Sequence, residues 1–169
     1  FQDRLILGAG NAVNSSRSGD YLNFFRRSVV TVVDDDPVNF TVIGGEEDTL
    51  RKTLIYDRNL VIFGDQQQYS IDGRRAFTPG SASAVVMSTV PNAAQVQPVF
   101  SENYMFYAKG NGQATSLHRF RPGSIEENPI IEELSQDLDD YMPGAPVTMR
   151  LHDTPNVAFL RTTGSSYLF

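Results

Sequence analysis

The sequence predicts an all-β protein, a partial β-propeller of four-stranded antiparallel blades with one short inserted helix. The first observation behind this prediction is a repeated pattern in residues 59–71, 103–120 and 156–169. Each segment begins with Asn, continues as an apolar strand, crosses a polar turn and returns as a second strand. The second observation is the spacing, because repeats of about 40 to 50 residues are typical of propeller blades. The third is the continuous apolar character of the first strands, which suits sheets buried on both faces.

The segments between these hairpins supply the remaining strands. Residues 29–33 and 38–43 are rich in β-branched side chains and flank a turn, while residues 84–87 and 96–100 precede the second hairpin. A β-sandwich with irregular loops is the alternative that the strand pattern leaves open. The predicted parts are a closing hairpin of an earlier blade at 4–16, blades at 29–71, 84–120 and 147–169, and a helical insertion at 128–142.

The helical insertion is predicted from a cap and a helical spacing. Asn128 is a favourable cap residue, Pro129 suits the first helical position, and Pro143 lies just beyond the expected end. Apolar residues recur at intervals of three or four, and carboxylates occupy the other side. The predicted acidic side is an ordinary solvated face or a surface that docks on a basic neighbour. Its candidate residues are Glu132, Glu133, Asp137 and Asp140.

Composition excludes several classes of function. The chain has 169 residues, 40% of them hydrophobic, which is enough for one core. The net charge of −6 argues against a sequence-reading nucleic-acid binder. Absence of Cys excludes disulfides and thiolate metal sites and suits a reducing cytoplasm. The sequence contains no membrane-length apolar run and no signal peptide, and its first residue is Phe1, so we expect a soluble piece of a longer polypeptide.

The residues that enzymes use for catalysis are sparse. The two histidines, His118 and His152, fall in different predicted blades, and His118 on an alternating strand is predicted to be structural. No zinc-protease motif, nucleophile elbow, phosphate loop or dinucleotide fingerprint occurs. The run from Asp34 to Asp36 offers oxygen ligands for a cation, but a turn before Pro37 explains it more simply. We therefore expect no enzyme activity, no catalytic residue, no cofactor and no metal.

One motif in the first part of the chain combines turn residues with aromatic side chains. Gly19 and Asp20 form a predicted turn with an Asp cap, after which Tyr21, Phe24 and Phe25 lie on one face of a short helical turn. Burial under a blade is the first interpretation, and an inter-subunit hot spot is the second. With the aromatic residues buried, Arg17, Arg26 and Arg27 are expected to be the part of the motif that meets something else. The candidate residues are Arg17, Gly19, Asp20, Tyr21, Asn23, Phe24, Phe25, Asp34, Asp35, Asp36 and Pro37.

This Ser-Arg-x-Gly-Asp-Tyr-x-Asn-Phe-Phe motif, followed by an Asp run that ends in Pro, resembles the signature of the tail nozzle family. The family is also called tail tubular protein B and occurs in short-tailed podoviral bacteriophages. The resemblance begins at Arg4 and extends to Met142. It implies a structural virion protein, assembled in the bacterial host cytoplasm, that forms the distal part of the short tail and gates and conducts genome ejection.

The resemblance also implies partners. They are copies of the same chain in a ring, reported as a hexamer, the tail adaptor (tubular protein A), the tail fibre protein, and viral double-stranded DNA that passes without sequence-specific binding. The acidic candidate residues would then face the lumen or a partner. A propeller-type glycan-binding or capsule-processing tail module is the alternative, although Trp is absent and the sialidase box does not occur. The hub protein that stabilises packaged DNA in other podoviruses is a further relative that the sequence does not separate.

Overall fold

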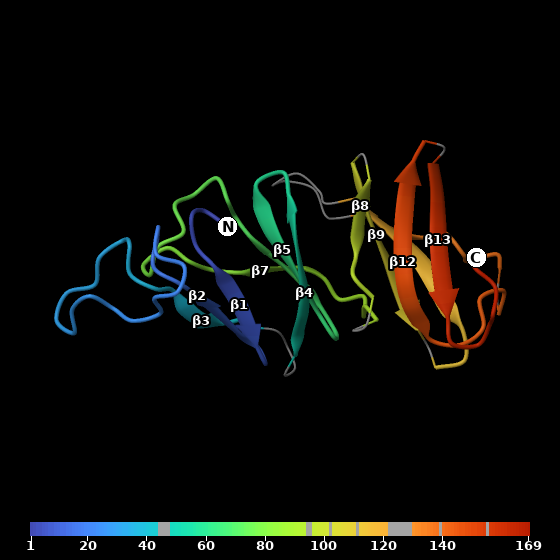
Figure 1. Ribbon diagram of the computed structural model, residues 1–169, viewed down its shortest axis with the longest axis horizontal. Coiled ribbons are helices and arrows are strands. Elements are labelled where there is room, and N and C mark those ends of the chain that lie inside the picture. The colour runs from blue at the N-terminus through green and yellow to red at the C-terminus, as the bar shows by residue number, and fades with distance from the viewer. Residues whose placement is uncertain are drawn as a thin grey trace. The chain divides into compact units, whose positions relative to one another are not determined.

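A computed structural model describes residues 1–43, 48–93, 96–101, 103–110, 112–121, 130–138, 140–154 and 156–169. Every regular element in these ranges is a β-strand, so the predicted all-β class is confirmed (Figure 1). No helix of the described ranges is long and apolar enough to span a membrane. The strands are β1 (Ile6–Ala9), β2 (Ala12–Ser15), β3 (Asn39–Thr41), β4 (Leu50–Tyr56), β5 (Asn59–Gly64), β6 (Gln68–Ile71), β7 (Val85–Ser88), β8 (Val99–Ser101), β9 (Tyr104–Gly110), β10 (Thr115–Arg121), β11 (Ile130–Glu133), β12 (Pro146–Asp153) and β13 (Asn156–Thr162).

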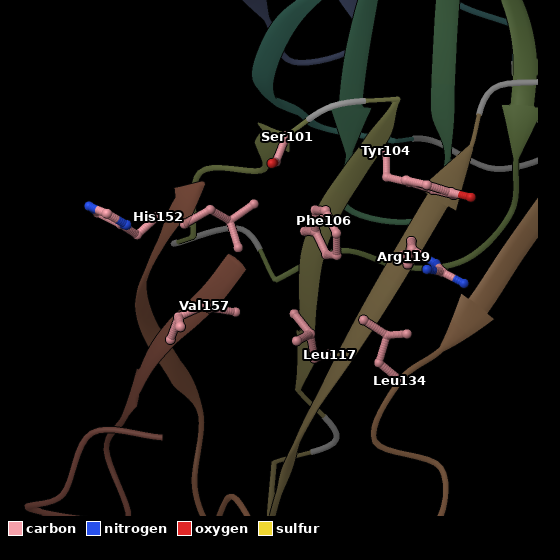
Figure 2. A pocket seen from close by; sticks show the side chains of 10 residues that line it. Ser101, Tyr104, Phe106, Leu117, Arg119, Leu134, His152 and Val157 are labelled. Atoms are coloured by element: carbon pink, nitrogen blue, oxygen red, sulfur yellow. The ribbon is translucent and has the colours of Figure 1, made fainter. Parts of the chain in front are cut away.

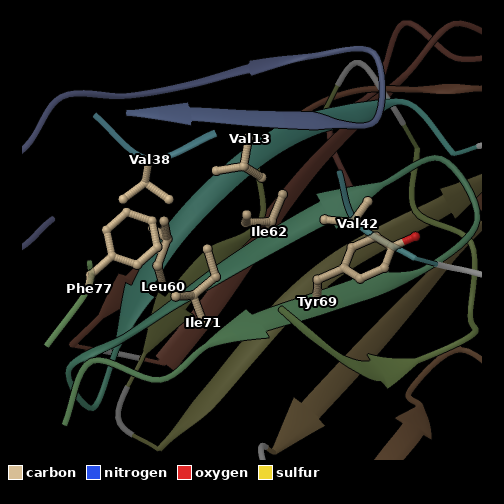
Figure 3. Packing of buried hydrophobic residues seen from close by; sticks show 8 residues of the cluster. All are labelled: Val13, Val38, Val42, Leu60, Ile62, Tyr69, Ile71 and Phe77. Atoms are coloured by element: carbon tan, nitrogen blue, oxygen red, sulfur yellow. The ribbon is translucent and has the colours of Figure 1, made fainter. Parts of the chain in front are cut away.

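The chain divides into two compact units, Phe1–Val90 and Pro91–Phe169. The first unit contains the three-stranded sheet β1-β2-β3 and the four-stranded sheet β4-β5-β6-β7. Side chains from both sheets meet in one core, where burying an aliphatic side chain contributes about 1.5–3 kcal/mol (Figure 3). The fully packed residues of this core are Val13, Val38, Val42, Leu60, Ile62, Tyr69, Ile71 and Phe77.

Strand β5 is central in its sheet, and this position explains its continuous apolar run. Its residues from Leu60 to Gly64 are all buried, because β4 and β6 pair with its two edges and other side chains cover its two faces. Strand β4 alternates between half-buried and exposed residues, as a sheet edge with one face toward water requires.

The turn after β5 depends on one buried carboxylate. Asp48 accepts hydrogen bonds from the Gln66 and Gln67 N–H groups at 3.0 Å each and from the Tyr69 hydroxyl at 3.1 Å. Burial and the Asp48 charge raise the pKa of Tyr69 to about 12. A Cβ on Gly64 would lie 2.1 Å from Asp48 Oδ2, so only glycine leaves room for this carboxylate.

The second unit contains the four-stranded sheet β11-β10-β9-β8 and the hairpin β12-β13. Its core includes Ala108 from β9, Met149 from β12 and Leu160 from β13, together with Val96 and Met142. Residues 166–169 return along β13 through a bridge from Leu168 to Arg161 and through the Phe169 N–H, which donates to the Leu160 carbonyl at 2.9 Å.

Three of the predicted hairpins are present in the structure. β5 pairs with β6, β9 with β10, and β1 with β2, all antiparallel. The third repeat differs, because the main partner of β13 is the preceding strand β12. The hairpins were predictable because strand and turn signals lie close together in the sequence.

The predicted helical insertion at 128–142 is wrong for the residues that the structure describes. Residues 130–133 form β11, which pairs antiparallel with β10, and turns follow it; Asn128 and Pro129 lie outside the described ranges. A short amphipathic helix is stable only when a core covers its apolar side, whereas one edge of β10 pairs with residues 130–133 along their whole length. These residues therefore form a paired strand, although their apolar spacing is that of a helix.

The strand predicted at 29–33 is also wrong, because these residues belong to no sheet. Two further strands fall in other sheets than the predicted blades imply: β3 pairs with β2, and β7 completes the sheet of β4, β5 and β6. The two four-stranded sheets therefore run from Leu50 to Ser88 and from Val99 to Glu133.

Candidate functional site

The aspartate run of the sequence motif folds back onto a buried arginine. Arg4 is 4% exposed, and its guanidinium donates to three carbonyls, those of Ser16 at 2.9 Å, Asp36 at 2.7 Å and Asp34 at 2.6 Å. Burial lowers the pKa of Arg4, while the charges of Asp35 and Asp36 act in the opposite direction. One side chain thus ties the end of β2 to the aspartate turn.

The carboxylates of the run bind protein groups. Asp35 accepts from Arg17 at 2.6 Å and lies 3.8 Å from the exposed guanidinium of Arg27. Asp36 is fully buried and accepts from the backbone N–H groups of Arg27 and Val33, each at 3.1 Å. These two hydrogen bonds lower the pKa of Asp36. The turn interpretation therefore accounts for Asp35 and Asp36, whose oxygens face donors of the chain.

The predicted Gly-Asp turn is present. Gly19 has φ of 72°, and its N–H donates to the Asp3 carbonyl at 2.9 Å. The Asn23 amide donates to the Asp20 carboxylate at 3.1 Å, and the Tyr21 hydroxyl donates to Asp3 Oδ1 at 2.5 Å. This last hydrogen bond raises the pKa of Tyr21. Polar contacts of the Gly-Asp turn therefore fix the start of the segment that follows it.

The aromatic side chains of the motif do not enter the core of this chain. Tyr21 is 52% and Phe25 is 81% exposed, so their predicted burial under a blade is wrong; Phe24 is half-buried. We name residues 21–33 the apolar loop, which in Figure 1 extends, in blue, away from β2 and β3. The interface interpretation of its aromatic residues stays a prediction. The most exposed aliphatic residues of the loop are Leu22, Val29 and Val30.

After the apolar loop, the chain re-enters the core. Pro37 is half-buried, and the N–H of Val38 donates to the Ser15 hydroxyl at 3.0 Å. The Ser15 N–H donates in return to the Val38 carbonyl at 2.8 Å. The loop therefore leaves and rejoins the first unit beside the end of β2, at the place where Arg4 also binds.

The four acidic candidate residues lie on β11 and in the segment after it. Glu132, Glu133, Asp137 and Asp140 are all exposed. Glu132 pairs with Arg119, and the guanidinium of Arg119 lies 4.5 Å from the centre of the Tyr104 ring. Exposed apolar side chains accompany these carboxylates. They are Ile130, Leu134, Leu138 and Tyr141.

A groove of about 300 Å³ in the second unit was not predicted from the sequence. Side chains of β9 and β10 form one side and those of β12 and β13 the other (Figure 2). Ser101 at its rim donates to Asp153 at 2.6 Å. Apolar residues dominate the lining, and the only signal for them was the alternation along β9 and β10. The lining residues are Ser101, Tyr104, Phe106, Leu117, Arg119, Leu134, Leu151, His152, Val157 and Ala158.

The histidines occupy different sheets and different surroundings. His118 on β10 is buried, stacks on Tyr107 with the ring centres 5.2 Å apart, and lies 2.9 Å from the Ser116 hydroxyl. Burial lowers the pKa of His118. His152 on β12 is exposed, and its Nδ1 accepts from the Thr154 N–H at 3.3 Å. Among the described residues no three His, Asp or Glu side chains form a group able to hold a metal.

Comparison with known proteins identifies a family and a relative. The model of the family described as bacteriophage nozzle protein matches residues 1–169. Tail tubular protein gp12 of Escherichia phage T7 is 22% identical to this chain over 144 residues. That alignment covers 85% of the chain but 18% of the T7 protein, so the chain spans about a fifth of the length of this relative.

Proposed function

The chain belongs to the bacteriophage nozzle protein family, and from this premise we propose that it is a structural part of the distal end of a short phage tail. In the virion it would gate and conduct the genome during ejection into the host cell. The relative from phage T7 carries the name of a tail tubular protein, which supports a role in a tube. The site residues support assembly rather than catalysis.

The apolar loop is the observation that carries this proposal. Leu22, Phe25, Val29 and Val30 are each at least 81% exposed, although the adjoining unit has a well-packed core. Contiguous exposed apolar side chains mark surfaces that a partner covers. The partners that the family suggests are copies of this chain in a ring, proposed as a hexamer, the tail adaptor (tubular protein A) and the tail fibre protein.

The charge of the chain suits a conduit for DNA. Its net charge is −6, and neutralising phosphates is the main source of affinity for DNA. A wall that attracted phosphates would slow a passing genome, whereas an acidic chain lets it pass. Viral double-stranded DNA is therefore a partner in transit, without sequence-specific binding.

The sheets support a propeller as the architecture of the assembled protein. In each four-stranded sheet the strand order follows the sequence, β4-β5-β6-β7 and β8-β9-β10-β11, with antiparallel pairs throughout. Blades of a β-propeller are four-stranded meanders of this kind. We propose the two sheets as successive blades, with β12 and β13 as the first strands of the next.

Immunogold electron microscopy of intact virions tests the proposed location. An antibody raised against this chain should label the distal tip of a short tail, and antibody preadsorbed with the chain should give no label. Label on a side appendage, or none on particles opened with mild denaturant, would contradict the nozzle location. Depolymerisation of host capsule by the purified protein would then favour the glycan-processing alternative.

A further inference from the structure

Residues 29–33 have the composition of a strand but no sheet in this chain. Four valines and one threonine make up the segment, and such β-branched residues favour strands. Val29 is 100%, Val30 88%, Val32 50% and Val33 39% exposed. Within the described chain, no backbone–backbone hydrogen bond joins residues 29–32 to another residue. The segment thus leaves its apolar side chains and part of its backbone groups in water.

The segment is held in place at both ends. The Asp36 carboxylate accepts from the N–H of Arg27 before it and from the N–H of Val33 within it. The Ser28 hydroxyl accepts from the N–H groups of Val30 at 3.2 Å and Thr31 at 3.3 Å. Ends that are already held reduce the conformational entropy lost when a partner binds, while residues 29 and 30 lie in a bend that extends when a strand forms. The geometry therefore favours a binding segment over an untethered loop.

A sheet edge with matching features lies in the second unit. β11 is the outermost strand in the order β11-β10-β9-β8, and no described strand pairs with its other edge. Three of its four residues are exposed, including Ile130 at 45%. Proteins usually protect such edges, because an open edge accepts an added strand.

Charge identifies the partner of this edge. The apolar loop carries Arg26 and Arg27 and no carboxylate, whereas β11 and the turn after it carry Glu133 and Asp137. If residues 29–33 run antiparallel to β11, Arg27 and Arg26 continue past Glu133 in the direction of Asp137. Opposite charges placed in this way fix the register of two surfaces and speed their encounter.

We propose that residues 29–33 of one copy add to β11 of a neighbouring copy as an antiparallel strand. This inference rests on the proposed ring of copies and names the surfaces that join them. Because two different surfaces meet, the contact is head-to-tail, the type that closes into a ring when repeated. The added strand covers Val29 and Val30 and gives hydrogen-bond partners to the backbone groups of residues 29–32 and of the β11 edge that have none among the described residues. It also explains why a strand-forming sequence occupies a loop.

Cysteine cross-linking of the intact protein that carries this chain tests the contact, since this chain has no Cys of its own. Copies with Val30→Cys are mixed with differently tagged copies with Glu133→Cys and oxidised. A covalent dimer carrying both tags is expected. Its yield should exceed that from mixing Val30→Cys copies with Ile130→Cys copies, because antiparallel pairing places Val30 toward the Glu133 end of β11. The matched control is Val85→Cys, a 66% exposed valine on the edge strand β7.

The outcomes separate the two proposals. If the intact protein forms rings but gives no mixed dimer, or if Val85→Cys cross-links equally well, the proposed strand pairing is wrong. The proposed ring of copies would not be affected by that result. Cross-linking inside one chain carrying both changes, with no mixed dimer, would also overturn it. A parent that forms no ring at all by light scattering would instead contradict the proposed ring.

A charge exchange provides a second measurement. Arg26→Glu with Arg27→Glu should lower ring formation about tenfold, through like-charge repulsion at the contact. Glu133→Arg with Asp137→Arg in the same protein should restore it. Restoration would not occur if the two arginines contacted another surface.

Discussion

Residues 29–33 and the run from Leu60 to Phe63 are both short and rich in aliphatic side chains, yet they meet opposite environments. Leu60 to Phe63 are at most 4% exposed, whereas Val29 is fully exposed. β5 has a paired strand on each edge, while residues 29–33 pair with no strand of the described residues. An apolar run in a sequence therefore indicates that the segment is stable when buried. Whether it is buried within the same chain depends on the elements that pack around it.

Both regions use a buried aspartate in the same way. Asp48 accepts two backbone N–H groups beside β5, and Asp36 accepts two at the ends of the exposed segment. In the first region the carboxylate supports a turn against a core. In the second it holds valines out in solvent, which suits a segment meant for another surface.

The largest expected effect is Ile62→Ala, which should lower the free energy of unfolding by about 2–5 kcal/mol because it leaves a cavity in the first core. The matched change Val30→Ala should alter it by less than about 0.5 kcal/mol, since Val30 packs against little in this chain. Denaturant unfolding of both variants measures the difference. Equal losses for the two variants would contradict the comparison.

Next in size is Arg4→Met, which should lower the free energy of unfolding by about 1–3 kcal/mol because it leaves buried carbonyls without donors. Amide hydrogen exchange of Arg27 and Val33 should become faster, because Arg4 holds the aspartate turn that binds them. The control is Arg75→Met, whose guanidinium is largely exposed. Unchanged exchange in Arg4→Met would show that the loop is held by other contacts.

A smaller effect concerns pH. The pKa of Asp36 lies below its ordinary value of 3.8, since backbone N–H groups stabilise the charged form. Asp36 therefore stabilises the fold above its unfolded pKa, and this contribution is lost as pH falls through the lower, folded pKa. Asp36→Asn should flatten the pH dependence of unfolding in this acid range. If the original protein and Asp36→Asn had the same pH profile of unfolding, the acid sensitivity would come from other groups than Asp36.

The smallest effect is expected for Tyr21→Ala. Because Tyr21 is exposed and its hydroxyl donates to Asp3 on the surface, the free energy of unfolding should fall by about 1 kcal/mol or less. A loss of several kcal/mol, measured by thermal unfolding, would place Tyr21 in a core after all. The control is Tyr69→Ala, which removes a buried ring and should cost about 3–5 kcal/mol.

Local patterns were enough for several features. The all-β class and the hairpins β1-β2, β5-β6 and β9-β10 were predictable, because their strand and turn signals lie within short stretches of sequence. The family was predictable from the motif around Gly19 and Asp20, and the family model confirms it. The exposure of the acidic candidate residues was predictable, although they were expected on a helix.

The positions of Arg4 and Ile130 show what needed tertiary structure. No local pattern indicates that Arg4 binds a turn some thirty residues away, or that Ile130 completes the edge of β10 instead of starting a helix. Helical spacing, strand propensity and apolar content each describe one segment alone, whereas burial and pairing depend on distant partners. Local sequence patterns predicted three hairpins of a nozzle-family chain but assigned residues 29–33 and 130–133 to the wrong kind of structure. Tertiary contacts decided which of them are buried, because pairing energy comes from residues far apart in the chain.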